Sequence, residues 1–344
     1  MENNFNQKQD CPLVFVRCLT FNHEAYIEDA LNGFVIQQTN FPFIVTIVND
    51  ASPDNTKNVI KTFIKKICDS SSIQYEQTSY ADIIKATPNN NSNCFLYVLN
   101  LYENHFQKKS HRPYYQEYVD KAKYWAECEG DDYWTDPLKL QKQVDFMEAN
   151  PDYVICSHKF KKRYMIDGHI EDMGYSSIFP EKSEDGCTFF LEQIYEKFYL
   201  QTLCVLYRRS ALNEERYLAH HQIRDNVLFL EIMRNGGKGY IFNSYDGVYR
   251  IHDGGVYSGL GKEKSLIEAI NLFEYIYRVF PANFTRVKLF YQYSNYISFL
   301  RLHYPWYKNV LGKRYLFYLR KRFYLIHGSL FKYAKRKLKI VLKK

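Results

Sequence analysis

The chain lacks the features that mark disulfide-bonded, exported or membrane-spanning proteins. Its eight cysteines are dispersed without a Cys-x-x-Cys pair, and several lie in apolar runs, where a free thiol behaves as a small buried hydrophobe. The N-terminal sequence MENNFNQKQD has no apolar segment typical of a signal peptide. No stretch approaches the ~18 uninterrupted apolar residues that a spanning helix needs. We therefore expect reduced thiols and a cytoplasmic location, with peripheral attachment to the inner face of the cell membrane as an open alternative.

Acidic residues are missing from the last part of the chain. Residues 301–344 contain 14 Lys or Arg and no Asp or Glu, whereas the preceding residues hold 32 basic and 38 acidic side chains, a net charge of −6. Such a basic segment is typical of contact with a polyanion. Its Tyr, Phe, Leu and Ile content favours an anionic membrane surface as the partner. We do not expect nucleic acid as a partner. A helix docked on the rest of the chain is the alternative.

Strand-like and helix-like segments alternate along the first two thirds of the chain. The hydrophobic content of 46% is sufficient for a buried core. Alternation with buried strands predicts an α/β fold with a mostly parallel sheet flanked by helices, in a domain over residues 1–260, followed by a helical basic region over 261–344. Strands are predicted at 13–19, 41–50, 73–77, 95–99, 124–128, 153–160, 201–207 and 240–242, and helices at 20–38, 52–67, 114–122, 137–152, 226–233 and from 263 onward.

The segment WAECEGDDYWTD places three carboxylates, Glu129, Asp131 and Asp132, within four residues. Mg²⁺ and Mn²⁺ prefer carboxylate oxygens, and such an ion would cancel the repulsion within the cluster. The cluster follows a predicted strand, and α/β sheets bind ligands beyond the carboxyl ends of their strands. A solvated turn is the alternative, with Asp132 or Asp136 capping a helix that starts at Pro137.

Two earlier turns also follow predicted strands. Thr20 and Asn22 come after the first strand, and Asn49 and Asp50 come after the second. Polar groups at one edge of a parallel sheet are suited to binding a base, a ribose and a diphosphate together. The alternative is ordinary turn chemistry, in which Asp and Ser side chains cap the following helices.

Two later segments carry further polar candidates. Asp225 stands just before an apolar helix, where the sequence alone favours a helix N-cap. Arg250 and His252 lie in GVYRIHDGGVYSG, beside Gly254 and Gly255. Arginine matches phosphate geometry and histidine binds phosphate or metal, although a lone histidine in a loop is more often a surface residue.

In their order, three motifs resemble those of family 2 glycosyltransferases with the GT-A fold, in the bacterial branch that builds surface polysaccharides. The motifs are CLTFNHEAYIEDAL, TIVNDASPDNT and YWAECEGDDYWTDPLKLQKQVDFM, and the resemblance covers roughly residues 12–255. Two positions depart from the family pattern. Asn49 stands where many members have Asp, and Glu129 replaces the commoner Asp.

The resemblance implies an inverting, divalent-metal-dependent transfer of a sugar from a nucleotide-diphosphate sugar to an acceptor hydroxyl on a glycan or a lipid-linked oligosaccharide. Asp225 would act as the catalytic base, and Mn²⁺ or Mg²⁺ would be held by Asp131, Asp132 and His252. The residues expected to bind the nucleotide sugar are Thr20, Asn22, Asn49, Asp50, Glu129 and Arg250.

Two other classes of function remain open at this point. A metal-dependent phosphohydrolase or nucleotidyltransferase also uses clustered carboxylates. A non-catalytic protein that binds sugars or membranes would share the basic tail and the aromatic content.

Overall fold

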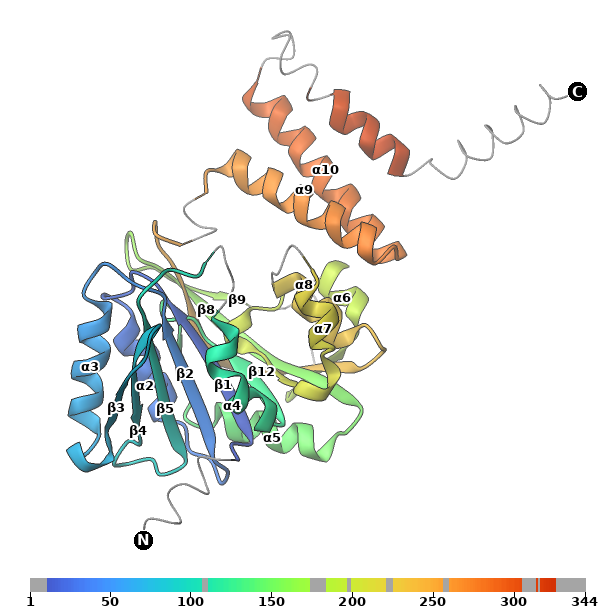
Figure 1. Ribbon diagram of the computed structural model, residues 1–344. Coiled ribbons are helices and arrows are strands. Elements are labelled where there is room, and N and C mark those ends of the chain that lie inside the picture. Colours follow the sequence, from blue (N-terminus) through green and yellow to red (C-terminus); the bar gives the residue numbers. More distant parts are fainter. Residues whose placement is uncertain are drawn as a thin grey trace, which may run out of the picture. The chain divides into compact units, whose positions relative to one another are not determined.

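The computed structural model describes residues 11–106, 111–173, 184–196, 199–220, 225–255, 260–304, 314 and 316–325. The chain divides into two compact units, Met1–His252 and Asp253–Lys344 (Figure 1). The sequence placed this division near residue 260. All eight cysteines are free thiols, most of them buried.

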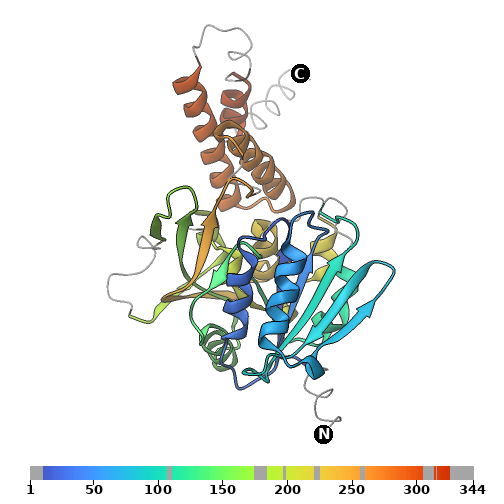
Figure 2. The ribbon, with the colours of Figure 1, turned by 90° about the vertical axis from the view of Figure 1, so that its left-hand side faces the viewer.

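The first unit is built on one sheet whose centre is parallel. The central strand β1 (Val14–Thr20) pairs in parallel with β2 (Phe43–Asn49) on one side and with β6 (Tyr124–Glu127) on the other, and β2 pairs in parallel with β5 (Cys94–Leu101). Every residue of β2, β5 and β6 is buried, as expected for strands covered on both faces. Helices α2 (Ile27–Val35) and α3 (Thr56–Ile67) lie side by side against the sheet (Figures 1 and 2).

The outer parts of the sheet are mixed, so the predicted mostly parallel arrangement holds for its centre and not for the sheet as a whole. The strand order is β10-β12-β8-β11-β6-β1-β2-β5-β4-β3, with β7 and β9 paired to β12 and β8. Strands β4 and β11 run antiparallel to their neighbours, while β12 runs parallel to β8. The bounds of these strands are β3 Gln74–Gln77, β4 Ala81–Ala86, β7 Tyr133–Trp134, β8 Tyr153–Tyr164, β9 Ile170–Met173, β10 Gly186–Phe189, β11 Leu206–Arg208 and β12 Lys238–Ile251.

Short helices complete the first unit. They are the α-helices α4 Gln116–Lys121, α5 Lys139–Ala149, α6 Leu191–Glu196, α7 Glu214–Leu218 and α8 Asp225–Met233, and the 3₁₀ turns η1 Ser70–Ser72, η2 Arg112–Tyr115, η3 Thr202–Cys204 and η4 Arg209–Ala211.

The predicted strand over 201–207 is wrong in its first half. Residues 202–204 form a 3₁₀ turn, and the strand begins only at Leu206. Side chains take the backbone carbonyls that a neighbouring strand would otherwise use: the Trp134 indole donates to the carbonyl of Leu203 at 2.7 Å, and the Gln143 amide donates to that of Cys204 at 2.8 Å.

Several predicted helices start too early. Helix α5 begins at Lys139, because Asp136 accepts the N–H of Leu138 at 2.8 Å and closes a turn that contains Pro137. Asp136 therefore shapes the entry to the helix without being its N-cap residue. Helix α2 begins at Ile27 and α3 at Thr56, since the residues before them form the turns described below. Strand β12 is much longer than the predicted 240–242.

The second unit is helical, as predicted for its described residues. Helices α9 (Lys262–Val279) and α10 (Asn283–His303) pack as a hairpin around buried Ile276, Tyr296 and Ile297, and residues 316–325 form a further helix. The rest of the predicted basic tail, 305–313, 315 and 326–344, lies outside the described residues. In the described part of the chain, no helix is long and apolar enough to cross a membrane.

Candidate active site

The acidic segment lies at the carboxyl edge of the parallel strands. After β6 ends, the chain stays beside β1: the N–H of Cys128 donates to the carbonyl of Arg17 at 3.0 Å, and the N–H of Gly130 donates to that of Leu19 at 2.9 Å. On the other side of β1, Thr20 is in register with Asn49 of β2. All three predicted turns therefore meet at one edge, where α/β sheets bind ligands.

Gly130 permits a close approach between the acidic segment and Thr20. A Cβ atom at this position would lie 2.6 Å from Thr20 Oγ1 and 2.9 Å from Ile27 Cδ1. Thr20 is itself buried, and its Oγ1 has no hydrogen-bond partner. Glycine is thus required for the carboxylates to sit against the end of β1.

We expect Gly130→Ala to lower the free energy of unfolding by about 1–3 kcal/mol, because the added methyl group must displace packed atoms. The matched control is Gly261→Ala, where a Cβ would have no atom within 4 Å. Thermal unfolding followed by circular dichroism measures both. Equal melting temperatures for the two variants would show that the contact is easily relieved.

The turns after β1 and β2 are bonded to each other. The N–H of Asn22 donates to Ser52 Oγ at 3.0 Å, and Ser52 in turn donates its N–H to Asn49 Oδ1 at 3.3 Å. Asn22 and Ala51 have positive φ angles of 59° and 57°. Such backbone strain in non-glycine residues concentrates at functional sites. Asn49 is buried, and its amide also donates to Asn100 Oδ1 at 3.1 Å.

Asp50 joins the end of β2 to the loop after β5. Its N–H donates to the carbonyl of Thr20 at 3.0 Å, and its Oδ1 accepts the N–H of His105 at 2.7 Å. Asn104 donates to the Asp50 carbonyl at 2.9 Å. These contacts fix the Asp50 carboxylate at the same edge as the acidic segment.

Asp131 lies between two histidines from distant segments. Its Oδ2 is 3.1 Å from Nε2 of His252 and 3.6 Å from Nε2 of His23, and one ligand atom from each of the three residues lies within 4.8 Å of the others. The second oxygen of Asp131, Oδ1, and Nδ1 of His23 are buried without a hydrogen-bond partner. We call these three residues the His–Asp–His cluster. The sequence predicted Asp131 and His252 for a metal but did not single out His23.

The electrostatics of the His–Asp–His cluster suit a divalent cation. Burial lowers the pKa of His23, and the neighbouring His252 lowers it further against the opposing charge of Asp131. Burial raises the pKa of Asp131, but the hydrogen bond from His252 and the charge of His23 outweigh it, so the pKa is lowered overall. A carboxylate oxygen together with two imidazole nitrogens is a donor set that divalent metals accept.

Arg250 holds the acidic segment from the end of β12. Its N–H donates to Asp132 Oδ1 at 2.9 Å, its Nη1 donates to the carbonyl of Asp131 at 2.8 Å, and its Nη2 pairs with Asp29. The guanidinium carbon lies 4.4 Å from the ring centre of Tyr133. Asp132 is buried in these contacts, and the structure does not bring it into the His–Asp–His cluster. Arg250 thus contacts both carboxylate residues of the acidic segment, Asp131 through its carbonyl and Asp132 through its side chain.

Asp225 begins helix α8 and belongs to the same electrostatic site. Burial and the charge of Glu127 raise its pKa to about 6, against a 3.3 Å hydrogen bond from the Tyr199 hydroxyl and the charge of Arg17. Glu127 itself pairs with Arg17 at 2.8 Å. Desolvation and then the charges of Asp131 and Asp225 raise the pKa of Glu129, even though this side chain is exposed. Glu129 and Asp225, which are 96 positions apart in the chain, are thus close enough for the charge of one to act on the other.

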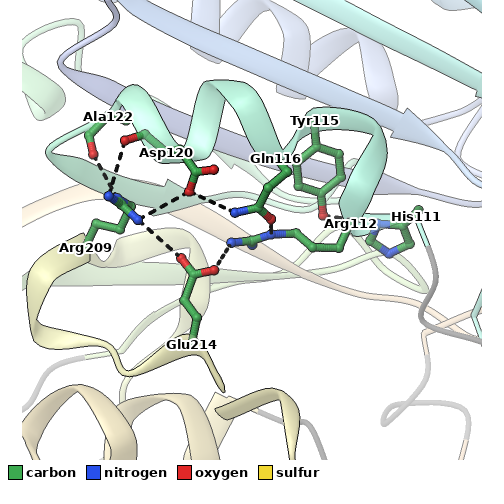
Figure 3. A network of polar contacts seen from close by, with 8 residues as sticks. All are labelled: His111, Arg112, Tyr115, Gln116, Asp120, Ala122, Arg209 and Glu214. Atoms are coloured by element: carbon green, nitrogen blue, oxygen red, sulfur yellow. Dashed lines mark hydrogen bonds and ion pairs between the residues drawn. The ribbon is translucent and has the colours of Figure 1, made fainter. Parts of the chain in front are cut away.

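A polar network joins η2, α4, η4 and α7 (Figure 3). Arg112 of η2 pairs with Glu214 of α7 at 2.8 Å, and Arg209 contacts both Glu214 at 3.8 Å and Asp120 of α4 at 3.5 Å. The Arg112 guanidinium carbon lies 4.3 Å from the ring centre of Trp125 in β6. Helix α7 is therefore tied to the central sheet, and Arg216 of α7 pairs in turn with the buried Glu231 of α8.

No protein-family model matches the sequence. Proteins of Mycobacterium bovis and Mycobacterium tuberculosis, themselves described as uncharacterized, are 32% identical over 192 residues, which is 56% of this chain. The chain spans 46% of the length of these relatives.

Similar solved structures include Staphylococcus aureus TarS 1–349, with a TM-score of 0.50 and 17% identity over 84% of this chain and 73% of that one. The same fragment in complex with UDP gives 0.48 and 16%, with the same coverage. A mannosyltransferase of Pyrobaculum calidifontis, in complex with GDP-Man and Mn²⁺, gives 0.49 and 14% over 93% of this chain and 86% of that one. At these identities the similarity concerns the fold. The predicted α/β fold, with a sheet similar to that of GT-A glycosyltransferases and a helical C-terminal region, is confirmed.

Proposed function

We propose that this protein is a glycosyltransferase that moves a sugar from a nucleotide-diphosphate sugar to an acceptor hydroxyl, with inversion at the anomeric carbon. One observation carries the proposal: the His–Asp–His cluster lies at the carboxyl edge of β1, β2 and β6, and the charges of its Asp131 and of Asp225 both act on Glu129 at this edge. A cation-binding group beside a base is the arrangement that such a transfer requires.

The His–Asp–His cluster would hold Mn²⁺ or Mg²⁺. Its fit rests on the buried, unpartnered oxygen of Asp131, which a cation would satisfy, and on the two imidazole nitrogens beside it. When bound, the ion supplies positive charge that offsets the charge developing on the leaving diphosphate. Mg²⁺ prefers oxygen ligands, so the two imidazole nitrogens of the cluster make Mn²⁺ the better candidate.

The nucleotide part of the donor is assigned to the turns after β1 and β2. Thr20 and Asn22 border one side of this edge and Asp50 the other, and all three positions are held by backbone hydrogen bonds. Asn49 and Arg250 act on the donor indirectly, by fixing the turns and the acidic segment. Glu129 is exposed beside the cluster, where its side chain faces the donor or the acceptor.

Asp225 is assigned the role of general base. With a pKa of about 6 it is ionised at neutral pH and still basic enough to accept a hydroxyl proton. The Tyr199 hydroxyl orients the carboxylate through its hydrogen bond. As the acceptor hydroxyl attacks the anomeric carbon, its proton passes to Asp225 and the bond to the nucleoside diphosphate breaks. A glycan or a lipid-linked oligosaccharide of the bacterial surface-polysaccharide type is the proposed acceptor.

The proposal predicts that Mn²⁺ and the correct nucleotide sugar together raise the melting temperature. Stabilisation follows RT ln(1 + [L]/Kd), so a ligand at 100 times its Kd adds about 2.7 kcal/mol. The measurement is a thermal-shift screen of UDP- and GDP-sugars with and without Mn²⁺, followed by an assay of nucleotide release.

Release that depends on an acceptor supports transfer. Phosphate release without an acceptor would assign the site to a phosphohydrolase or nucleotidyltransferase instead. Donor binding without turnover in any acceptor mixture would point to a sugar-binding protein.

A further inference from the structure

The helix over residues 316–325 is oriented against the usual pattern of a surface helix. Four positions at helical spacing, Tyr318, Lys321, Arg322 and Leu325, are partly buried. The remaining positions of the helix are exposed, and we call them the outer face: Leu316, Phe317, Leu319, Arg320, Phe323 and Tyr324. A helix facing only water turns its apolar stripe inward and its charges outward.

The inner face is docked by polar and aromatic contacts within the second unit. Lys321 Nζ donates to Glu274 of α9 at 2.6 Å, and the Arg322 guanidinium carbon lies 4.6 Å from the ring centre of Phe290. The ring of Tyr318 lies 4.9 Å from that of Tyr296 in α10. Two of the helix's three cations are thereby turned toward α9 and α10, and these contacts set which face is left outside.

The outer face is apolar except for Arg320. Leu316 is 63% exposed and Phe323 is 55% exposed, and Phe317, Leu319 and Tyr324 lie on the same side of the helix. Five large apolar or aromatic side chains on one short helix exceed the scattered apolar residues that are normal on a surface. A contiguous patch of this kind indicates a partner.

The charges around the patch identify the kind of partner. Arg320 lies within the outer face, and no acidic residue occurs anywhere in 301–344, which holds 14 Lys or Arg. A second copy of the chain would bring two such basic segments together, with like charges opposed. An anionic lipid surface instead offers apolar depth for the leucines and aromatic rings and negative headgroups for the arginine.

We propose that the outer face of helix 316–325 lies in the interfacial region of an anionic bilayer, parallel to its plane, as the membrane-contact surface of the protein. Leu316, Leu319 and Phe323 enter the boundary between headgroups and acyl chains, and Arg320 contacts lipid phosphates. The proposal does not depend on the proposed enzymatic activity, because the contact lies entirely within the second unit.

The test is a vesicle flotation assay with the full chain, without donor or acceptor. The wild-type protein is expected to float with phosphatidylglycerol-containing vesicles and only weakly with phosphatidylcholine vesicles. The outer-face variant carries Leu316→Ser, Leu319→Ser and Phe323→Ser. It is expected to lower the partition coefficient about 100-fold, because three apolar side chains can no longer enter the bilayer. Arg320→Gln is expected to lower it about five-fold on the anionic vesicles alone.

The matched control replaces three exposed apolar residues in the first unit, Ile36→Ser with Tyr75→Ser and Ile166→Ser, and is expected to bind vesicles like the wild type. Equal partitioning of the wild type and the outer-face variant overturns the proposal, as does a control variant that loses binding equally. Light scattering adds a further criterion. A wild-type dimer that the outer-face variant converts to a monomer assigns the face to a second copy of the chain and also overturns the proposal.

Discussion

Asp225→Asn is expected to lower kcat by about 10²–10⁴-fold, the range typical of a lost general base, while the donor binds with unchanged affinity. The amide has the size of the carboxyl and still accepts the hydrogen bond from Tyr199, but it cannot take a proton from the acceptor hydroxyl. The measurement is acceptor-dependent nucleotide release at saturating donor, with donor affinity from calorimetry. The matched control is Asp145→Asn, an exposed carboxylate on α5.

The pH profile separates this role from a structural one. Because Asp225 must be ionised to act as the base, kcat/KM of the wild type is expected to rise with pH through about 6 and then to level off. Asp225→Asn should lose this acidic limb together with the rate. A variant that is slow but keeps the limb would indicate that another group titrates and that Asp225 merely caps α8.

Asp131→Asn is expected to lower the affinity for Mn²⁺ by more than about 100-fold, since even residues that only support a metal ligand are worth about 10–100-fold. Asp131 is the only carboxylate in the His–Asp–His cluster and the member in contact with both imidazoles. Calorimetric titration of the protein with Mn²⁺ alone measures the effect without reference to catalysis. Sugar transfer should fall in parallel.

Variants of neighbouring residues test which groups bind the ion. His23→Ala is expected to weaken Mn²⁺ binding, whereas Asp132→Asn should largely preserve it, because Asp132 Oδ1 is engaged by the N–H of Arg250. If Asp132→Asn loses Mn²⁺ binding and His23→Ala keeps it, the metal ligands are Asp131 and Asp132, and the His–Asp–His cluster is not the metal site.

The sequence predicted the parallel centre of the sheet because β1, β2, β5 and β6 are buried on both faces and appear as apolar runs. It also placed Thr20, Asp50 and Asp131 at one edge, since each follows such a run. The mixed outer strands were harder to predict. Strands β4 and β11 are short. Their antiparallel pairing depends on which strand each one meets in the folded sheet, and the local sequence does not specify that strand.

The candidate site was predicted only in part for a similar reason. His23 lies in an ordinary polar turn, and only the return of β12 brings His252 beside it and Asp131. Asp132 and Asp131 are chemically equivalent neighbours in the sequence. The direction of the backbone after β6 distinguishes them, because Asp132 lies against Arg250 and Asp131 lies against the histidines.

The contacts of Arg250 also determine when the site can form. This residue connects Asp29 near the start of the chain, 221 positions away, with the acidic segment 119 positions away. Contacts of such long sequence separation slow folding, because the entropy of closing the long intervening loop is lost before the contact stabilises the chain. A nascent chain that has not yet added β12 holds His23 and Asp131 but neither Arg250 nor His252. The candidate metal site therefore cannot be complete before β12 has joined the sheet, so Mn²⁺ binding is expected to report chains in which β12 is in place.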